Sequence, residues 1–141
     1  MKGVAMKDVI ASLAYDSWTQ PKPELRSVPL PDRHLIFEGN GLILDLLLKK
    51  QGRGTCLHIG GQVLPGNNPL SAVSDVAVQM EQGAHRSSTR TNPLGEFAFD
   101  AVPNGAFDLV IILKHHRFIV RGLSNEELRD WQVVAGTASK G

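Results

Sequence analysis

Residues 89–113 read TRTNPLGEFAFDAVPNGAFDLVIIL. Phe97 and Phe99 alternate with polar or small residues, and this period of two is typical of a strand with one face in a core. The turn signal Pro103-Asn104-Gly105 separates this strand from a second apolar run that begins at Phe107. The stretch therefore predicts two strands joined by a tight hairpin turn.

Similar short segments lie on both sides of this stretch, separated by Gly, Pro and Asn. The leucines of residues 42–48 alternate, with tight-turn signals at residues 39–41 and 51–54. Asp45 within this run is expected to face water on an edge strand or, alternatively, to pair with a buried arginine. The other predicted strands are residues 55–64, 76–81, 86–91 and 118–120. Short strands at this spacing predict an all-β protein, a Greek-key β-sandwich of about seven strands over residues 32–123.

Residues 1–31 have a different pattern. The apolar positions with the i, i+3, i+4 spacing of a helix are Val9, Ile10, Leu13 and Ala14. Four prolines then follow between residues 21 and 31, and each removes a backbone donor. We therefore expect a short N-terminal helix followed by an extended, proline-rich arm.

The C-terminal segment, residues 124–141, carries its own helix signal. Ser124 and Glu127 have the spacing of a capping box, in which each side chain bonds a backbone N–H of the first turn. The sequence predicts a short helix over residues 125–134 and an irregular tail after it.

The stretch from residue 61 to residue 113 also follows a family pattern. Its order is a strand, a loop, a second strand, a Thr-x-Thr strand, a Gly-x-Phe-x-Phe strand and a Pro-x-Gly hairpin. The residues that carry it are 61–63, 69–73, 76–80, 89–99 and 102–109. The chain thereby resembles the carboxypeptidase regulatory-like domain, a relative of the transthyretin-like (prealbumin-like) sandwiches.

That resemblance implies a fold and an adaptor or scaffolding role, and it implies no chemistry. We expect a positive φ at Gly95. Asn92 stands where the family usually has Asp, and Asn can cap the same turn. A second likeness, carried by residues 14–18, 33–38 and 42–46, is to short stand-alone bacterial proteins with this sandwich.

Composition narrows the class of protein. The chain has 141 residues, 42% of them hydrophobic, which is enough for one domain with a substantial core. Net charge is +1, whereas dedicated nucleic-acid binders usually carry a strong basic excess. No run reaches the roughly 18 apolar residues of a membrane span, and a single cysteine leans towards a reducing compartment. We expect a cytoplasmic protein that binds neither nucleic acid nor membrane.

Three motifs invite a catalytic or metal-binding interpretation, and none is complete. Residues 120–124 and His58 are similar to parts of the transthyretin-like hydrolase of 5-hydroxyisourate, but the tyrosine of that family's terminal tetrapeptide is absent. His115 and His116 would point to opposite faces of a strand, so they cannot chelate together outside a turn. Cys56 shares a strand face with His58 but lacks an evident orienting group. We expect no enzyme, no cofactor and no metal.

The two terminal segments contain the candidate contact residues. Aromatic residues outside a core often anchor interfaces, and the alternative is that each tail covers its own sandwich. The candidate interface residues are Tyr15, Trp18, Leu25, Leu128 and Trp131. Two functions are consistent with this pattern. One is a non-enzymatic regulatory or interaction module for a protein partner, and the other is a self-assembling subunit joined into an oligomer or filament through its arm and sheet edges.

Overall fold

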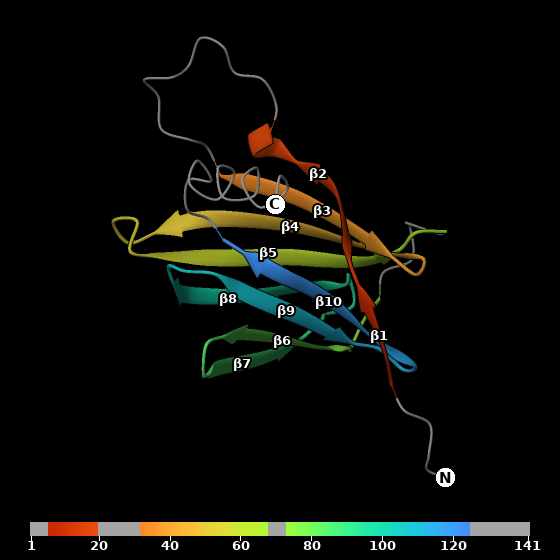
Figure 1. The fold of residues 1–141 in the computed structure, drawn as a ribbon. Coiled ribbons are helices and arrows are strands. Elements are labelled where there is room, and N and C mark those ends of the chain that lie inside the picture. The colour runs from red at the N-terminus through yellow and green to blue at the C-terminus, as the bar shows by residue number, and fades with distance from the viewer. Residues whose placement is uncertain (1–5, 20–31, 68–72, 125–141) are drawn as a thin grey trace, which may run out of the picture.

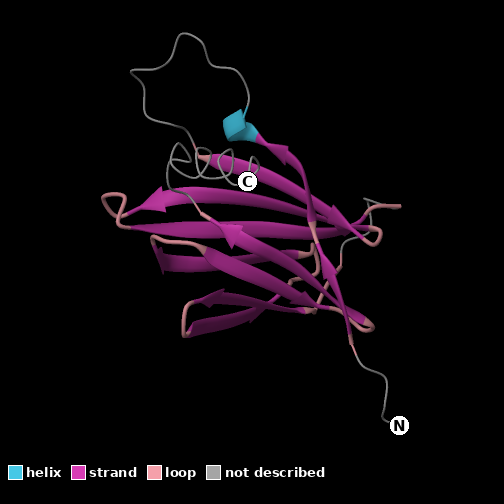
Figure 2. Ribbon diagram, in the orientation of Figure 1, coloured by secondary structure: helices cyan, strands magenta, loops and turns pink. Residues whose placement is uncertain are grey.

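Two five-stranded β-sheets pack face to face in the computed structural model of the protein (Figures 1 and 2). The structure describes residues 6–19, 32–67 and 73–124. One sheet has the order β1-β10-β9-β6-β7 and the other β2-β3-β4-β5-β8. The strands are β1 (Lys7–Ile10), β2 (Ser12–Asp16), β3 (Arg33–Gly39), β4 (Leu42–Gln51), β5 (Cys56–Pro65), β6 (Ala77–Gln82), β7 (His85–Arg90), β8 (Glu96–Pro103), β9 (Phe107–Ile112) and β10 (His116–Leu123), with a 3-10 turn, η1 (Ser17–Thr19), after β2. The predicted all-β sandwich is confirmed, with ten strands in place of about seven.

The core lies between the two sheets and follows the predicted alternation. In β4, Leu44, Leu46 and Leu48 have no exposed surface, and burial of each such side chain contributes about 1.5–3 kcal/mol. Phe97 and Phe99 also face inward, and their rings contact edge to face with centroids 6.1 Å apart. A period of two in the sequence therefore identified the inner face of both strands.

The predicted tight turns are confirmed where they connect neighbouring strands. Asn40 and Gly41 have φ values of 51° and 77° between β3 and β4, which is the pattern of a type I′ hairpin turn. Gly95 has the expected positive φ, 79°. Before it, Asn92 Oδ1 accepts hydrogen bonds from the N–H groups of Leu94 and Glu96 at 2.9 and 2.8 Å. An asparagine thus caps this turn, as expected.

The connection at Asn104-Gly105 is not the hairpin that the sequence predicts. β8 pairs with β5 in one sheet, whereas β9 pairs with β6 and β10 in the other. The turn therefore passes the chain from one sheet to the other. Turn chemistry is local and could be predicted, but the sheet that the next strand joins depends on long-range pairing.

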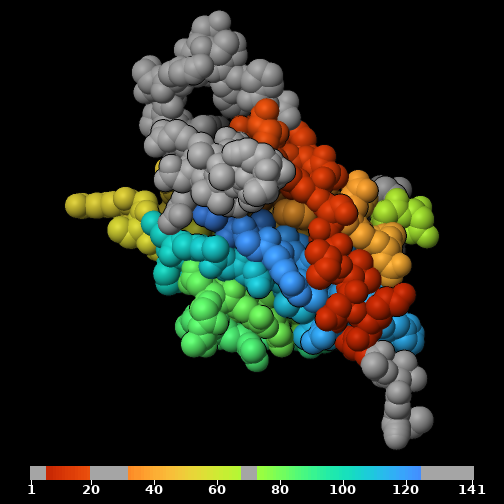
Figure 3. Space-filling view, in the orientation of Figure 1, coloured from red at the N-terminus to blue at the C-terminus, as the bar shows by residue number. Residues whose placement is uncertain are grey.

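The N-terminal segment is extended, and the prediction of a helix there is wrong. β1 runs parallel to β10, the chain crosses between the sheets at Ala11, and β2 runs antiparallel to β3. Figure 3 shows this segment as an extended red band on the surface of the molecule. At the crossing, the Ala11 N–H donates to the carbonyl oxygen of Ile119 at 2.8 Å. A helix this short has marginal stability alone, whereas the edges of β10 and β3 offer partners to its backbone groups.

Two further predictions concern other parts of the chain. The proline-rich arm over residues 20–31 and the helix over residues 125–134 lie outside the described residues. They stay predictions, as do the domain boundaries at residues 31 and 123.

A buried ion pair fixes the end of the crossing strand. Arg33 Nη2 and Nε donate to the two carboxylate oxygens of Asp16 at 2.6 and 3.1 Å. The side chains of Arg33 and Asp16 are only 8% and 4% exposed. Arg33 Nη1 donates to the carbonyl oxygen of Ser124 at 2.7 Å, and the guanidinium carbon lies 4.8 Å from the centre of the Trp18 ring. This cluster therefore joins the segments that follow β2 and β10 to the start of β3.

We expect Arg33→Ala to lower the free energy of unfolding by about 3–5 kcal/mol, because it leaves the Asp16 carboxylate buried without its counter-ion. Urea denaturation followed by circular dichroism measures the loss. The double variant Asp16→Ala, Arg33→Ala serves as the control, since removal of both charges should destabilise the fold by less than the sum of the two single changes. Additive losses would contradict a coupled pair.

Candidate functional site

The outer, solvent-facing side of the β2-β3-β4-β5-β8 sheet carries three rows of side chains that cross β4, β5 and β8. The pairing register and one hydrogen bond define the rows, which are Asp45, Gln62 and Glu96; Leu47, Gly60 and Ala98; and Lys49, His58 and Asp100. Neighbouring rows are about 7 Å apart, because they are separated by two residues along each strand. The first and third rows are polar, whereas the middle row is apolar.

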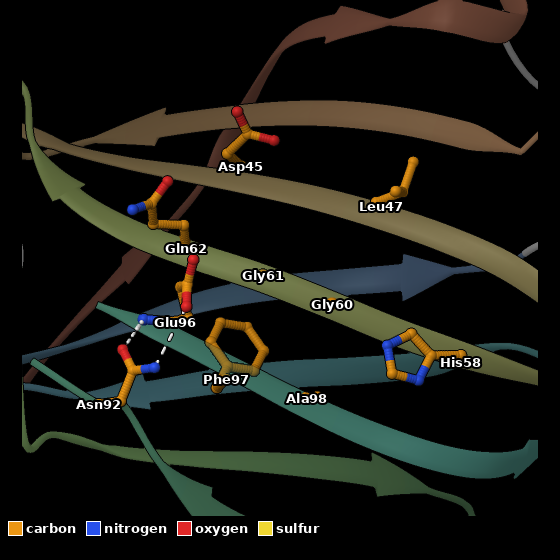
Figure 4. Close-up of a pocket in the computed structure, with 10 residues that line it drawn as sticks. All are labelled: Asp45, Leu47, His58, Gly60, Gly61, Gln62, Asn92, Glu96, Phe97 and Ala98. Carbon is orange, nitrogen blue, oxygen red and sulfur yellow. Dashed lines mark hydrogen bonds between the residues drawn. The ribbon is translucent and has the colours of Figure 1, made fainter. Parts of the chain in front are cut away.

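The middle row is low at Gly60 and Ala98, and a groove of about 560 Å³ lies there, beside Leu47. Gly60 has no side chain and Ala98 has a single methyl group, so the polar rows stand on either side as two walls. Figure 4 shows Asp45, Gln62 and Glu96 following one another across three strands, with His58 on the far side of Gly60. The groove therefore has a backbone and apolar floor between two polar walls.

The two adjacent glycines of β5 have different roles. A Cβ on Gly61 would lie 2.3 Å from Cζ of Phe97, so the phenyl ring occupies the place of a side chain. A Cβ on Gly60 would meet no atom nearer than His58 Nε2 at 3.6 Å. Glycine inside a strand often marks a close approach of another group. Gly61 thus seats an aromatic ring against the backbone, and Gly60 opens the groove.

Hydrogen bonds hold the first wall in place. Asp45 Oδ1 lies 2.7 Å from His34 Nε2, Gln62 Nε2 donates to a backbone carbonyl oxygen at 2.8 Å, and Asn92 Nδ2 donates to Glu96 Oε1 at 3.2 Å (Figure 4). Asp45 faces water as expected, but it does so from the central strand of the sheet and pairs with a histidine. The prediction of an edge strand is wrong because the tight turns at both ends of β4 return the chain alongside it, so β4 pairs with β3 on one side and with β5 on the other.

The second wall is a histidine held by a carboxylate. His58 Nδ1 lies 2.6 Å from Asp100 Oδ1, and Gln51 Nε2 donates to the same oxygen at 3.1 Å. The hydrogen bonds from His58 and then Gln51 hold the pKa of Asp100 below its ordinary value of 3.8. With Nδ1 engaged, the other ring nitrogen of His58 lies over Gly60, where it can bond a group in the groove.

The groove is acidic. Asp45 and Glu96 line it and Asp100 stands behind His58, whereas Lys49, at the β4 end of the His58 row, is the one lysine or arginine of the three rows. Carboxylates form short, strong hydrogen bonds with guanidinium and ammonium groups. The apolar stem of such a side chain could lie on the floor beside Leu47, which is 37% exposed.

The described residues of this face do not assemble a complete catalytic or metal centre. A histidine oriented by a carboxylate is part of many nucleophilic sites, but no hydrogen bond joins His58 to Cys56. In the described ranges, no three His, Cys, Asp or Glu side chains are grouped so as to hold a metal ion. What this face presents to solvent is a set of hydrogen-bonding and charged groups around the groove.

The structure describes two of the five predicted interface residues. Tyr15 lies in β2, 37% exposed, and its ring is 5.4 Å from that of His34, next to the first wall. Trp18 packs on Arg33 of its own chain, which favours the alternative that this segment covers its own sandwich. Leu25, Leu128 and Trp131 lie outside the described residues.

Sequence reasoning did not predict the groove. The available signal was the pair Gly60-Gly61 inside a predicted strand, because glycine there weakens a strand unless it serves packing or close approach. The rows themselves depend on the register of three strands, and a shift of one residue would reverse every side chain.

Within the described ranges, the structure contains no helix of the length and apolar character needed to cross a bilayer. Comparisons with protein-family models, with curated proteins and with solved structures found no match.

We expect Gly61→Ala to lower the free energy of unfolding by about 1–3 kcal/mol, because the new methyl group overlaps the Phe97 ring. Gly60→Ala is the matched control on the adjacent residue, and its stability should stay within about 1 kcal/mol of wild type. Thermal and urea denaturation measure both. Equal losses in the two variants would contradict the assignment of inner and outer faces.

We expect the Asp100 carboxyl group to titrate below 3.8 in carbon-detected NMR. His58→Ala should raise this pKa towards 3.8, and Gln51→Ala should raise it less. Because folding lowers the pKa, the group's contribution to stability is present above pH 3.8 and is lost as the pH falls through the folded-state pKa. A midpoint that His58→Ala leaves unchanged would show that the hydrogen bond does not form in solution.

Proposed function

We propose that the protein is a non-enzymatic regulatory or interaction module that binds a protein partner in the bacterial cytoplasm, and that the groove receives a side chain of that partner. One observation carries the proposal. The outer sheet face combines a floor left bare at Gly60 with two walls of fixed polar side chains. Such a site offers a guest both apolar contact and directed hydrogen bonds.

The shape supports a protein segment over a small metabolite. Small-molecule sites usually enclose most of the ligand, whereas this groove has two walls on an open sheet. Leu47 and Leu94 near it are 37% and 60% exposed, and a polypeptide that lies across the strands would cover them. Exposed apolar residues beside polar ones are typical of protein interfaces.

The charge supports a basic guest. Asp45, Glu96 and Asp100 stand in or directly behind the walls and outnumber Lys49, the one lysine of the three rows, and each carboxylate can accept from a lysine or arginine side chain. Because the carboxylates are already held by His34, Asn92 and His58, a guest would meet acceptors in fixed positions, which lowers the entropic cost of binding.

The resemblance of residues 61–113 to the carboxypeptidase regulatory-like domain supports the same function. That likeness implies an adaptor or scaffolding role for a Greek-key sandwich, and the two-sheet architecture is compatible with it. Membership of that family, in a bacterial protein, is part of the proposal.

A self-assembling subunit, joined through its arm and sheet edges, is the second candidate. Ile10 and Leu13 on the N-terminal strands are each 53% exposed, and a contact between copies would cover them. Light scattering over a concentration series separates the candidates. A fixed mass above 15.3 kDa, or growth to large species, supports assembly, and a monomer at every concentration rejects it.

The groove itself is tested with Gly60→Val. Valine suits a strand and adds two methyl groups beyond Cβ to the floor, so the fold should hold while the site is filled. The partner is a bacterial protein captured both by wild type and by the control Gly60→Ala. We expect calorimetry to show that this partner binds Gly60→Val at least about tenfold more weakly than it binds wild type, which is roughly 1.4 kcal/mol. Equal affinity of wild type and Gly60→Val would show that the partner does not use the groove.

A further inference from the structure

The two sheets have four edge strands, and three of these strands are either very short or irregular. β1 has only four residues, β2 has an irregularity between Leu13 and Tyr15, and β8 contains Ala101 with φ 55° and ends at Pro103. Natural proteins use short strands, bulges and prolines of this kind to prevent pairing with other chains. β7 is different, because its six residues pair with β6 in one unbroken register.

The backbone groups that β7 leaves open can be assigned. β6 and β7 are joined by Gly83-Ala84, with φ 60° at the glycine, as in a two-residue type II′ turn. In such a hairpin the residues next to the turn form a hydrogen-bonded pair, and the pairs then alternate. Thr91 continues the series, since its N–H donates to Val76 and its carbonyl accepts from Asp75. The backbone N–H and C=O groups of the even-numbered residues Arg86, Ser88 and Arg90 therefore point away from the sheet.

The side chains of these same residues place two arginines along the edge, each beside one carboxylate of its own sheet. Arg86, Ser88 and Arg90 are exposed, and the two arginine side chains are 68% and 59% exposed. Arg86 lies 3.6 Å from a carboxylate oxygen of Glu81 and Arg90 lies 2.8 Å from one of Asp75. Both pairs are in solvent, and a guanidinium has five N–H donors, so each arginine can bind a second carboxylate.

These charges disfavour a second copy of β7 in the antiparallel register that would pair all three outward residues. Two β7 strands paired antiparallel about Ser88 would place Arg86 of each copy opposite Arg90 of the other. Like charges directly opposite across a strand pair are destabilising. A segment with carboxylates at those positions would instead be stabilised.

We infer that the free edge of β7 binds an extended, acidic segment of a partner protein as an added strand of the β1-β10-β9-β6-β7 sheet. The backbone of Arg86, Ser88 and Arg90 pairs with the segment, and Asp or Glu at alternate positions face the two arginines. In Figure 1 β7 lies at the lower left of the two sheets, and no described strand lies beyond it in its own sheet. The inference rests on the proposed protein-binding function, but the binding edge belongs to a different sheet from the one that carries the groove.

The test uses NMR on the full-length protein with two synthetic nine-residue peptides, one alternating threonine with glutamate and one alternating threonine with lysine. We expect the glutamate peptide to shift the β7 resonances and to protect the amides of Arg86, Ser88 and Arg90 from exchange, and the lysine peptide to do neither. Binding of both peptides alike, binding of neither, or shifts centred on another edge would overturn the inference.

Ser88→Pro removes the central outward donor without removing a hydrogen bond to β6. Ser88→Pro should weaken binding of the glutamate peptide by about tenfold or more, whereas the matched control Ser88→Ala should bind this peptide like wild type. If the proline variant does not fold, the double variant Arg86→Ala, Arg90→Ala provides a second test. It should no longer bind the glutamate peptide more tightly than the lysine peptide. Unchanged binding by these variants would refute strand addition at β7. Gly60→Val should bind the peptide normally, so failure here and failure of the groove are distinguishable.

Discussion

Arg33 and Asp16 meet in a site almost closed to water, and the rest of the sandwich depends on that contact. A buried charge is tolerated only when it is paired and hydrogen bonded, and here one guanidinium bonds both carboxylate oxygens and a carbonyl oxygen after β10. The contact fixes where β2 ends against β3. Because β1 and β2 are consecutive pieces of one extended segment, it also holds the strand that joins the two sheets. Gly39 lets this strand pass, since a Cβ there would lie 3.1 Å from Val9 Cγ1 and from Phe118 Cε1.

The candidate site depends on the fixed pairing of the strands in one of these sheets. A fixed register of β4, β5 and β8 brings residues distant in sequence into rows, and two glycines in one of those strands convert part of a flat face into a groove. Gly61 accepts the Phe97 ring on the inner face while Gly60 leaves the outer face bare. The same strand thus contributes to the core and to the site.

Part of this arrangement could be predicted from the sequence, and the division has a physical cause. The strands around Leu44, Leu46 and Phe97 and the turn at Asn40-Gly41 were predicted correctly, because side-chain alternation and positive φ values are local properties. The N-terminal strands were not, since their hydrogen-bond partners lie in β3 and β10. The crossing at Asn104-Gly105 and the groove were missed for the same reason: each depends on which strands are neighbours and in what register. The central position of Asp45 is different, because the predicted turns at both ends of β4 already place a strand on each side of it.

The parallel pairing of β1 with β10 has a mechanical consequence. These are the first and last strands of the described fold, they point in the same direction, and their register runs from Lys7↔His116 to Ile10↔Ile119. If the two ends of the chain were pulled apart, the tension would slide one strand along the other and load their hydrogen bonds in shear, all at once. Bonds in an antiparallel terminal hairpin would open one after another. The sandwich should therefore withstand stretching better than its equilibrium stability alone suggests, because forced rupture follows the unfolding barrier.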